Sequence, residues 1–207
     1  VNNNKTIQIL KNILYSSDKG AQIFIEDQGS NGKSYLLQAI CNDFSNSNNS
    51  SIYIPMQEAI NLDPSILEGV SELYLICIDD IDLINKHREW EIALFNLINE
   101  CYEKDCFLLL SGSINKLKAI PDLVSRIKKM ETLRLEAIND DELLEATQAI
   151  SKNLNIEISD KNMNYLINNS KRDIKSIFRA LSQLEKESLE RKKSIGLNLI
   201  KEVIQSS

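Results

Sequence analysis

Three consecutive residues, Gly32, Lys33 and Ser34, have the types and the order that can hold a phosphate group. A glycine lets backbone N–H groups face phosphate oxygens, a lysine ammonium reaches the outer phosphates, and a serine hydroxyl can bind Mg²⁺. The complete pattern also has a glycine five residues before Gly32, where this chain has Asp27. Asp adopts a left-handed backbone more readily than most residues do. Taken alone, the segment fits either a phosphate loop or an ordinary strand-to-helix turn.

An acidic pair, Asp79-Asp80, follows the apolar run 75–78, about 45 residues after Lys33. At the carboxyl end of a buried strand beside a phosphate loop, one acid holds the Mg²⁺ shell and its neighbour can polarise water. The alternative is a strand that simply ends on a solvated acidic turn. Because both elements occur in the expected order on strand ends, the sequence predicts a nucleotide site. In it, Ser34 and Asp79 are the expected Mg²⁺ ligands, and Asp80 is the acid that acts on water.

Further polar residues follow the next apolar run. Ser111 or Ser113, at the end of that run, could sense the terminal phosphate or orient water. Arg126 lies on an expected short helix, where it is either a surface ion-pairing residue or a finger that acts on a partner's nucleotide. The basic segment 171–175 opens a long helix, and its cations could reach phosphates or could begin a solvated face.

The elements that must position these residues follow from hydrophobic periodicity. Up to about residue 137, apolar β-rich runs alternate with helical periods. The expected strands are 22–26, 51–55, 72–78, 106–110 and 130–135, and the expected helices are 5–16, 35–44 and 90–102. The period of the last helix places Ile92, Phe95, Leu97, Ile98 and Cys101 inward.

From Asn139 the pattern changes to helical periods alone, and the only strand candidate is the brief run 156–158. The expected helices are 140–153, 160–169, 172–191 and 197–205, the first of which opens with a near capping box. We therefore expect an α/β lobe over residues 1–137 and an all-helical lid over 138–207.

Charge and cysteine usage limit the partners. The chain has 24 basic and 30 acidic residues, a net charge of −6, and neither lobe has the basic excess of an autonomous DNA-binding domain. No apolar run is long enough to span a membrane. Cys101 and Cys106 lack a second pair or a nearby histidine to complete a zinc set, and the only histidine, His87, is expected on the surface. The four cysteines therefore indicate reduced, buried thiols in a cytoplasmic protein.

These segments together resemble the AAA+ superfamily, within it the initiator clade of DnaA, and most closely the Hda family of DnaA-related regulatory inactivators. The resemblance rests on residues 29–39, 52–55, 75–81, 90–99, 121–126, 172–181, 183–189 and 200–204, which span nearly the whole chain. Its most specific parts are Trp90-Glu91 and the run Pro-Asp-Leu-Val-Ser-Arg at 121–126. The phosphate-loop segment alone would not identify the family.

The resemblance implies a P-loop NTPase core with a five-stranded parallel sheet and a small all-helical lid, binding ADP or ATP with Mg²⁺. It also implies a catalytic role for Arg126 as an arginine finger in trans, together with Asp80 and Ser113. The residues implied around the nucleotide are Gly29, Ser30, Asn31, Gly32, Lys33, Ser34, Tyr35 and Lys175. The implied partners are DnaA and the DNA polymerase sliding clamp. A homodimer is a further candidate assembly, and strong direct DNA binding is not expected.

The chain departs from the family pattern at four places. Asp27 replaces the first loop glycine, and the segment 113–115 replaces the usual Asp-Arg-Pro. Lys175 replaces the sensor arginine of the lid, and lysine offers a point charge rather than a fork. No clamp-binding motif is readable near the N-terminus, since Gln8 lies within a helical pattern, and we expect that motif to lie outside this chain.

The first three departures predict weak or absent intrinsic ATPase activity. Two other interpretations remain open: the nucleotide domain of a DnaA-type initiator or loader, and an AAA+ ATPase or adaptor unrelated to replication. The full reading frame distinguishes them, because a clamp motif upstream favours the regulator and a basic domain downstream favours the initiator.

Overall fold

The computed structural model describes residues 3–16, 20–27, 32–47, 49–136, 140–171 and 173–206. Contacts between residues divide the chain into two compact units. The first, called here the α/β unit, comprises residues 2–29 and 33–136, and the second, called the helical unit, contains residues 137–207.

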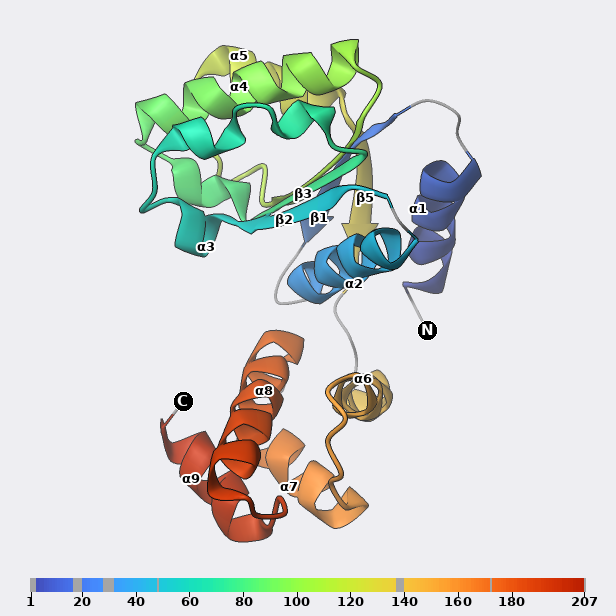
Figure 1. Cartoon of the computed structure of the whole chain (residues 1–207), viewed down its shortest axis with the longest axis vertical. Coiled ribbons are helices and arrows are strands. Elements are labelled where there is room, and N and C mark those ends of the chain that lie inside the picture. Colours follow the sequence, from blue (N-terminus) through green and yellow to red (C-terminus); the bar gives the residue numbers. More distant parts are fainter. Residues whose placement is uncertain are drawn as a thin grey trace. The chain divides into compact units, whose positions relative to one another are not determined.

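The α/β unit is built on a sheet of five parallel strands in the order β2-β3-β4-β1-β5 (Figure 1). The strands are β1 Gln22–Asp27, β2 Ser51–Pro55, β3 Leu75–Asp79, β4 Phe107–Gly112 and β5 Glu131–Leu135. Strands β3 and β4 are buried along their whole length, which is why they read as continuous apolar runs. The predicted five-stranded parallel sheet is confirmed.

Helices cover both faces of this sheet (Figure 1). They are α1 Asn4–Ser16, α2 Lys33–Asn46, α3 Met56–Ala59, α4 Arg88–Glu103 and α5 Pro121–Lys129. Helices α4 and α5 pack on one face through Trp90, Leu94 and Ile127, whereas α1 and α2 pack on the other through Leu10 and Leu37. Successive strand residues serve alternate faces, so the two cores share the same strands.

Two details of this unit differ from the sequence-based expectations. Strand β3 begins at Leu75 rather than at residue 72, because Val70–Glu72 form a short 3-10 helix, η2, that ends the preceding connection. The inner side of α4 includes Leu94, whereas Ile92 is 43% exposed. Trp90 and Leu94 are one helical turn apart, and Ile92 lies between them in sequence and therefore on another side of the helix.

The remaining short helices of the unit are η1 Pro64–Leu67, before β3, and η3 Ile81–Ile84, directly after it. The four cysteines are buried free thiols, as expected from the sequence. None of the described helices combines the length and the apolar character needed to cross a membrane.

The helical unit consists of α6 Asp140–Asn153, α7 Asp160–Asn169, α8 Ile174–Arg191 and α9 Leu197–Ser206, with no strand among its described residues. The Asp173 side chain caps α8 by accepting a hydrogen bond from the Ser176 N–H at 2.8 Å. The core of the unit includes Leu143, Leu166, Ile177 and Ile200, all buried.

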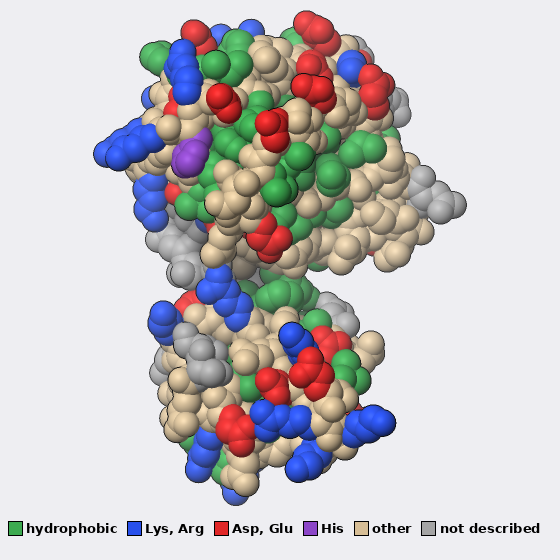
Figure 2. Space-filling view, turned by 60° about the vertical axis from the view of Figure 1, so that its left-hand side comes forward, with side chains coloured by type: hydrophobic (Ala, Val, Ile, Leu, Met, Phe, Trp, Pro, Cys, Tyr) green, Lys and Arg blue, Asp and Glu red, His purple; other side chains and the backbone are tan. Residues whose placement is uncertain are grey.

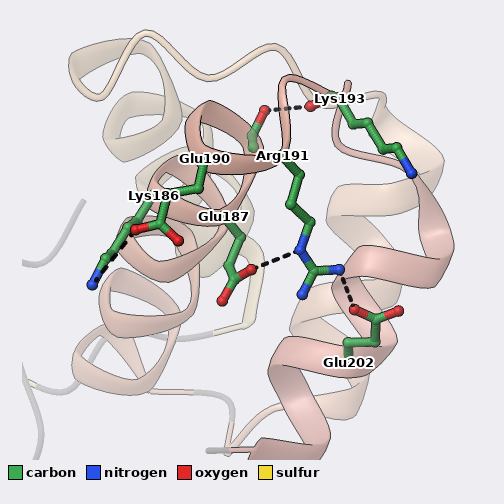
Figure 3. A network of polar contacts seen from close by, with 7 residues as sticks. Lys186, Glu187, Glu190, Arg191, Lys193 and Glu202 are labelled. Atoms are coloured by element: carbon green, nitrogen blue, oxygen red, sulfur yellow. Dashed lines mark hydrogen bonds and ion pairs between the residues drawn. The ribbon is translucent and has the colours of Figure 1, made fainter.

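One arginine ties the last two helices together (Figure 3). The Arg191 guanidinium, at the end of α8, donates to Glu187 at 2.8 Å and to Glu202 of α9 at 2.7 Å. Lys192, which follows it, has a left-handed backbone (φ 51°), and the Ser188 hydroxyl donates to the Lys193 carbonyl at 2.6 Å. These contacts fix the turn between α8 and α9.

Candidate nucleotide site

The first part of the site lies where β1 leads into α2. Gly32 has a φ of 80°, a conformation that glycine adopts without the steric cost of a Cβ. Helix α2 begins at the next residue, so the half-buried side chains of Lys33, Ser34 and Tyr35 lie in its first turn. The N–H groups of a first turn lack partners within the helix and attract anions. The first turn of α2 thus brings together a hydroxyl, an ammonium and backbone N–H donors.

Part of the predicted loop lies outside the described residues. This applies to Gly29, Ser30 and Asn31, and to the side chain of Asp27. Their contacts with phosphate, which the family resemblance implies, stay predictions.

The second part lies at the carboxyl end of β3. The Asp79 side chain is only 3% exposed, and both of its carboxylate oxygens accept hydrogen bonds, one from the Tyr53 hydroxyl at 2.9 Å and one from the Ser111 hydroxyl. Burial, and then the charge of Asp79, raise the pKa of the Tyr53 hydroxyl well above its ordinary value. Tyr53 therefore stays protonated and acts as a donor, so that neighbouring strands hold this carboxylate from both sides.

Ser111 connects the two acids of the pair. Its hydroxyl donates to Asp79 and accepts from the Asp80 N–H at 3.1 Å. Asp80 has a left-handed backbone (φ 56°), and its Oδ1 lies 4.0 Å from the Lys33 ammonium. The structure thus brings Lys33, Asp79, Asp80 and Ser111 together from β3, β4 and α2.

Of the two serines considered from the sequence, Ser111 contacts the acidic pair. Ser113 lies beyond the end of β4, and its N–H donates to Asp82 at 3.0 Å. A role for the Ser113 hydroxyl stays a prediction.

Gly112, at the end of β4, allows that strand to pack closely against Ile81 and Asp82 of η3. A Cβ on Gly112 would lie 2.8 Å from Asp82 Oδ1 and 3.1 Å from Ile81 Cγ1, which is closer than such contacts ordinarily are. Sequence reasoning missed Gly112 and Tyr53. The signal for Gly112 was its place at a strand end in a chain with only six glycines. For Tyr53 no signal was available, because the side chain it touches lies on another strand.

The third part of the α/β unit that concerns the site is α5, which carries Arg126. The segment before this helix is held by side chains that follow β3. The Asn85 side chain donates to the Lys116 carbonyl at 2.9 Å and accepts from the Lys118 N–H at 2.7 Å. The buried Glu91 carboxylate accepts from the N–H of Ile120, the residue before α5, at 3.0 Å. The Asn85 and Glu91 side chains therefore fix the backbone that leads into α5.

Arg126 itself is exposed. Its guanidinium lies over the ring of Phe95 on α4, 5.9 Å from the ring centroid, within the range of a cation–π contact. Phe95 is half-buried and packs against the core. The Phe95 ring thus contacts one side of the Arg126 guanidinium, and the arginine remains exposed and accessible to a partner.

The other predicted nucleotide contact, Lys175, lies in the first turn of α8 in the helical unit. Its side chain is outside the described part of the structure, and its role stays a prediction.

The described residues fit a nucleotide with Mg²⁺. Among them, no group of three or more His, Cys, Asp and Glu side chains could hold a metal ion by itself. Mg²⁺ at nucleotide sites takes only one or two carboxylates and completes its shell with phosphate oxygens and water. Ser34 and Asp79 carry oxygen atoms of the kind that such a shell uses, and Lys33 carries a cation of the kind that pairs with phosphate.

Solved structures share this architecture. Domain III of the replication initiator DnaA from Thermotoga maritima matches with a TM-score of 0.73 at 18% identity, over 99% of this chain and 92% of that one. AMPPCP-bound DnaA from Aquifex aeolicus matches with a TM-score of 0.64 at 20% identity, over 92% of this chain and 66% of that one. The Thermotoga maritima RuvB Holliday junction branch migration motor matches with a TM-score of 0.60 at 16% identity, over 98% and 67%.

These likenesses show the fold: the chain has the AAA+ P-loop fold of DnaA and RuvB, with a helical lid region. The chain spans about two thirds of the longer DnaA structure that it matches, 66% of its length. Residues 140–204 match the lid domain of Hda. The lid segment is therefore similar to that of Hda, and the whole chain has the fold of DnaA domain III, as the resemblance seen in the sequence predicts.

Proposed function

We propose that this chain binds an adenine nucleotide, ADP or ATP, at the carboxyl edge of β1, β3 and β4. The observation that supports this is the meeting of the Lys33 ammonium, the Asp79-Asp80 pair and the Ser111 hydroxyl beside the first turn of α2. A DnaA structure of the same fold was determined with AMPPCP, a nucleotide analogue.

The residues have distinct roles in this proposal. Lys33 binds the outer phosphates, while Ser34 and Asp79 hold Mg²⁺, which when bound balances phosphate charge. Tyr53 and Ser111 keep the Asp79 carboxylate in one orientation. Asp80 orients water, and Ser113 and Lys175 stand at the positions that sense phosphate. Because Ser113 and Lys175 differ from the family's usual residues there, hydrolysis by this chain alone is weak or absent.

The regulatory action that we propose is exerted through Arg126 on ATP held by DnaA, in an assembly with the sliding clamp. A guanidinium placed against the transferring phosphoryl group stabilises its charge and accelerates hydrolysis by about 10³–10⁵-fold. The observation that carries this step is the exposure of Arg126 on a helix whose start is fixed by Asn85 and Glu91. The result is conversion of ATP-bound DnaA to its ADP form, which limits initiation of replication.

The test compares Arg126→Ala with the unchanged protein in two assays. Nucleotide affinity and the unfolding midpoint should change little, because an exposed arginine contributes little to stability. Decay of DnaA-bound ATP, in a mixture with clamp and DNA, should fall to the rate without this protein. Arg134→Ala is the control in the decay assay alone, since Arg134 is an exposed arginine on β5 whose Nε bonds the buried Glu26 at 3.0 Å, so its loss should also lower stability. Normal decay with Arg126→Ala would remove the finger assignment.

The second candidate, the ATPase domain of an initiator itself, is supported by the match over 92% of DnaA domain III. The Hda lid match favours the regulator. Turnover of ATP by this chain alone at several per second would favour neither and would contradict the proposed weak hydrolysis.

A further inference from the structure

The basic residues of the α/β unit are concentrated in two short segments, 86–88 and 116–129. These segments carry seven of the 13 Lys and Arg residues found up to residue 137, against one acidic residue, Asp122. The other residues up to 137 contain six basic and 18 acidic residues. The seven basic side chains are all exposed, and together we call them the α5 basic surface: Lys86, Arg88, Lys116, Lys118, Arg126, Lys128 and Lys129.

Hydrogen bonds hold the two segments side by side. Asn85, next to the first segment, bonds to the backbone of both Lys116 and Lys118. The Glu91 oxygen that accepts from the Ile120 N–H also lies 3.7 Å from the Arg88 guanidinium. The charges of Lys86, Arg88, Lys116 and Lys118 therefore lie around the start of α5, and those of Arg126, Lys128 and Lys129 follow in its last turn.

Figure 2 shows this arrangement from outside: the single histidine, which lies between Lys86 and Arg88 in sequence, has Lys and Arg side chains beside it at the margin of the α/β unit. Carboxylates appear over other parts of the same face. Although the chain has a net charge of −6, the α5 basic surface is thus positively charged.

We propose that the α5 basic surface is the docking surface for the anionic rim of an ATP-loaded protein partner, meaning the polyphosphate and the acidic side chains beside it. This proposal rests on the function proposed for Arg126. Exposed charges of one sign steer a partner of the opposite sign and raise the association rate, while they add little to the lifetime of the complex. The lysines therefore bring the partner's phosphates to Arg126, and Arg126 acts on them.

Nucleic acid is the less suitable occupant. A duplex runs on past a small protein and carries charge along its whole length. Beyond this surface it would meet the part of the unit that has 18 acidic and six basic residues. A protein partner with a local cluster of negative charge meets no such repulsion.

The experiment removes charge without touching Arg126. The variant is Lys116→Gln/Lys118→Gln/Lys128→Gln, and the control is Lys5→Gln/Lys11→Gln/Lys161→Gln, three exposed lysines on α1 and α7 with the same loss of charge. Binding to DnaA loaded with AMPPCP is followed by stopped-flow fluorescence across a range of salt concentrations. We expect the association rate to fall about tenfold at low salt for the variant, with a flatter salt dependence, and the dissociation rate to change less than about twofold.

Several outcomes would overturn the proposal. They are an equal fall in the control, an unchanged salt dependence in the variant, or direct binding of a labelled duplex that the variant alone loses, which would make this a nucleic-acid surface. Arg126→Ala is measured in the same binding assay and in the ATP-decay assay. If it binds and decay stays normal, the finger function fails. If decay is lost but the lysine variant associates normally, only the docking surface fails.

Discussion

The cluster around Asp79 and the helix that carries Arg126 solve the same problem, the placing of one charged side chain, in opposite ways. Asp79 is buried and is held directly by the side chains of Tyr53 and Ser111. Arg126 is exposed, and the backbone that leads to it is held by Asn85 and Glu91. In the first region a change in the chemistry is also a change in the fold. In the second, the charged side chain can be removed while the hydrogen bonds that hold the backbone remain.

The largest effect expected on the buried side follows from Lys33→Ala. Removing a partly buried ammonium from bound phosphates should weaken ADP and ATP binding by at least about 100-fold. The side chain is 11% exposed and lies 4.0 Å from Asp80. A fluorescence titration with a labelled nucleotide measures this, with Lys11→Ala on α1 as the control. Retained affinity would mean that the nucleotide binds elsewhere.

A second test separates two serines of the same connection. Ser111→Ala removes the hydroxyl that bonds both the Asp80 N–H and one Asp79 oxygen, and the free energy of unfolding should fall by about 1–3 kcal/mol. Ser113→Ala should change it by less than about 0.5 kcal/mol, because there the backbone N–H makes the bond to Asp82. Urea unfolding measures both. Equal losses would show that the two hydroxyls are not distinguished by their contacts.

A smaller effect is expected from the ring beneath the arginine. Phe95→Leu keeps an apolar side chain on α4 but removes the cation–π contact with Arg126. The stimulated rate at saturating concentration should fall about two- to fivefold, while the half-saturating concentration stays the same. Phe95→Tyr, which keeps a ring, should retain the rate. A change in half-saturation instead would assign Phe95 to docking rather than to positioning.

The smallest effect belongs to the helical unit, where Arg191 joins α8 to α9 through exposed ion pairs. Arg191→Ala should lower the melting temperature slightly, and high salt should remove the difference, because exposed pairs are screened. Lys186→Ala, which removes a weaker pair within α8, should have no measurable effect. A large loss would show that this turn organises the whole unit.

The features that could be predicted from the sequence are those that depend on a single helix or strand. The period of each strand and helix, the acids at the end of β3 and the arginine on a short helix all follow from local pattern. The choice between Ser111 and Ser113 does not, because it depends on how β3 and β4 are aligned in the sheet. The same holds for Tyr53, which reaches Asp79 only because β2 lies beside β3. On α4, Ile92 and Leu94 are equally apolar, and only packing distinguishes them.

The strand order also governs when the site can form during folding. Strand β4 lies between β3 and β1, and it pairs Phe24 with Leu110, residues 86 positions apart. During synthesis, β1 and the start of α2 leave the ribosome long before the strand that joins them to Asp79. Pairing over such a distance closes a long loop, which slows folding. The nucleotide site is therefore complete only after β4 has been made, and the two backbone edges of β1 stay unpaired until β4 and then β5 have been made.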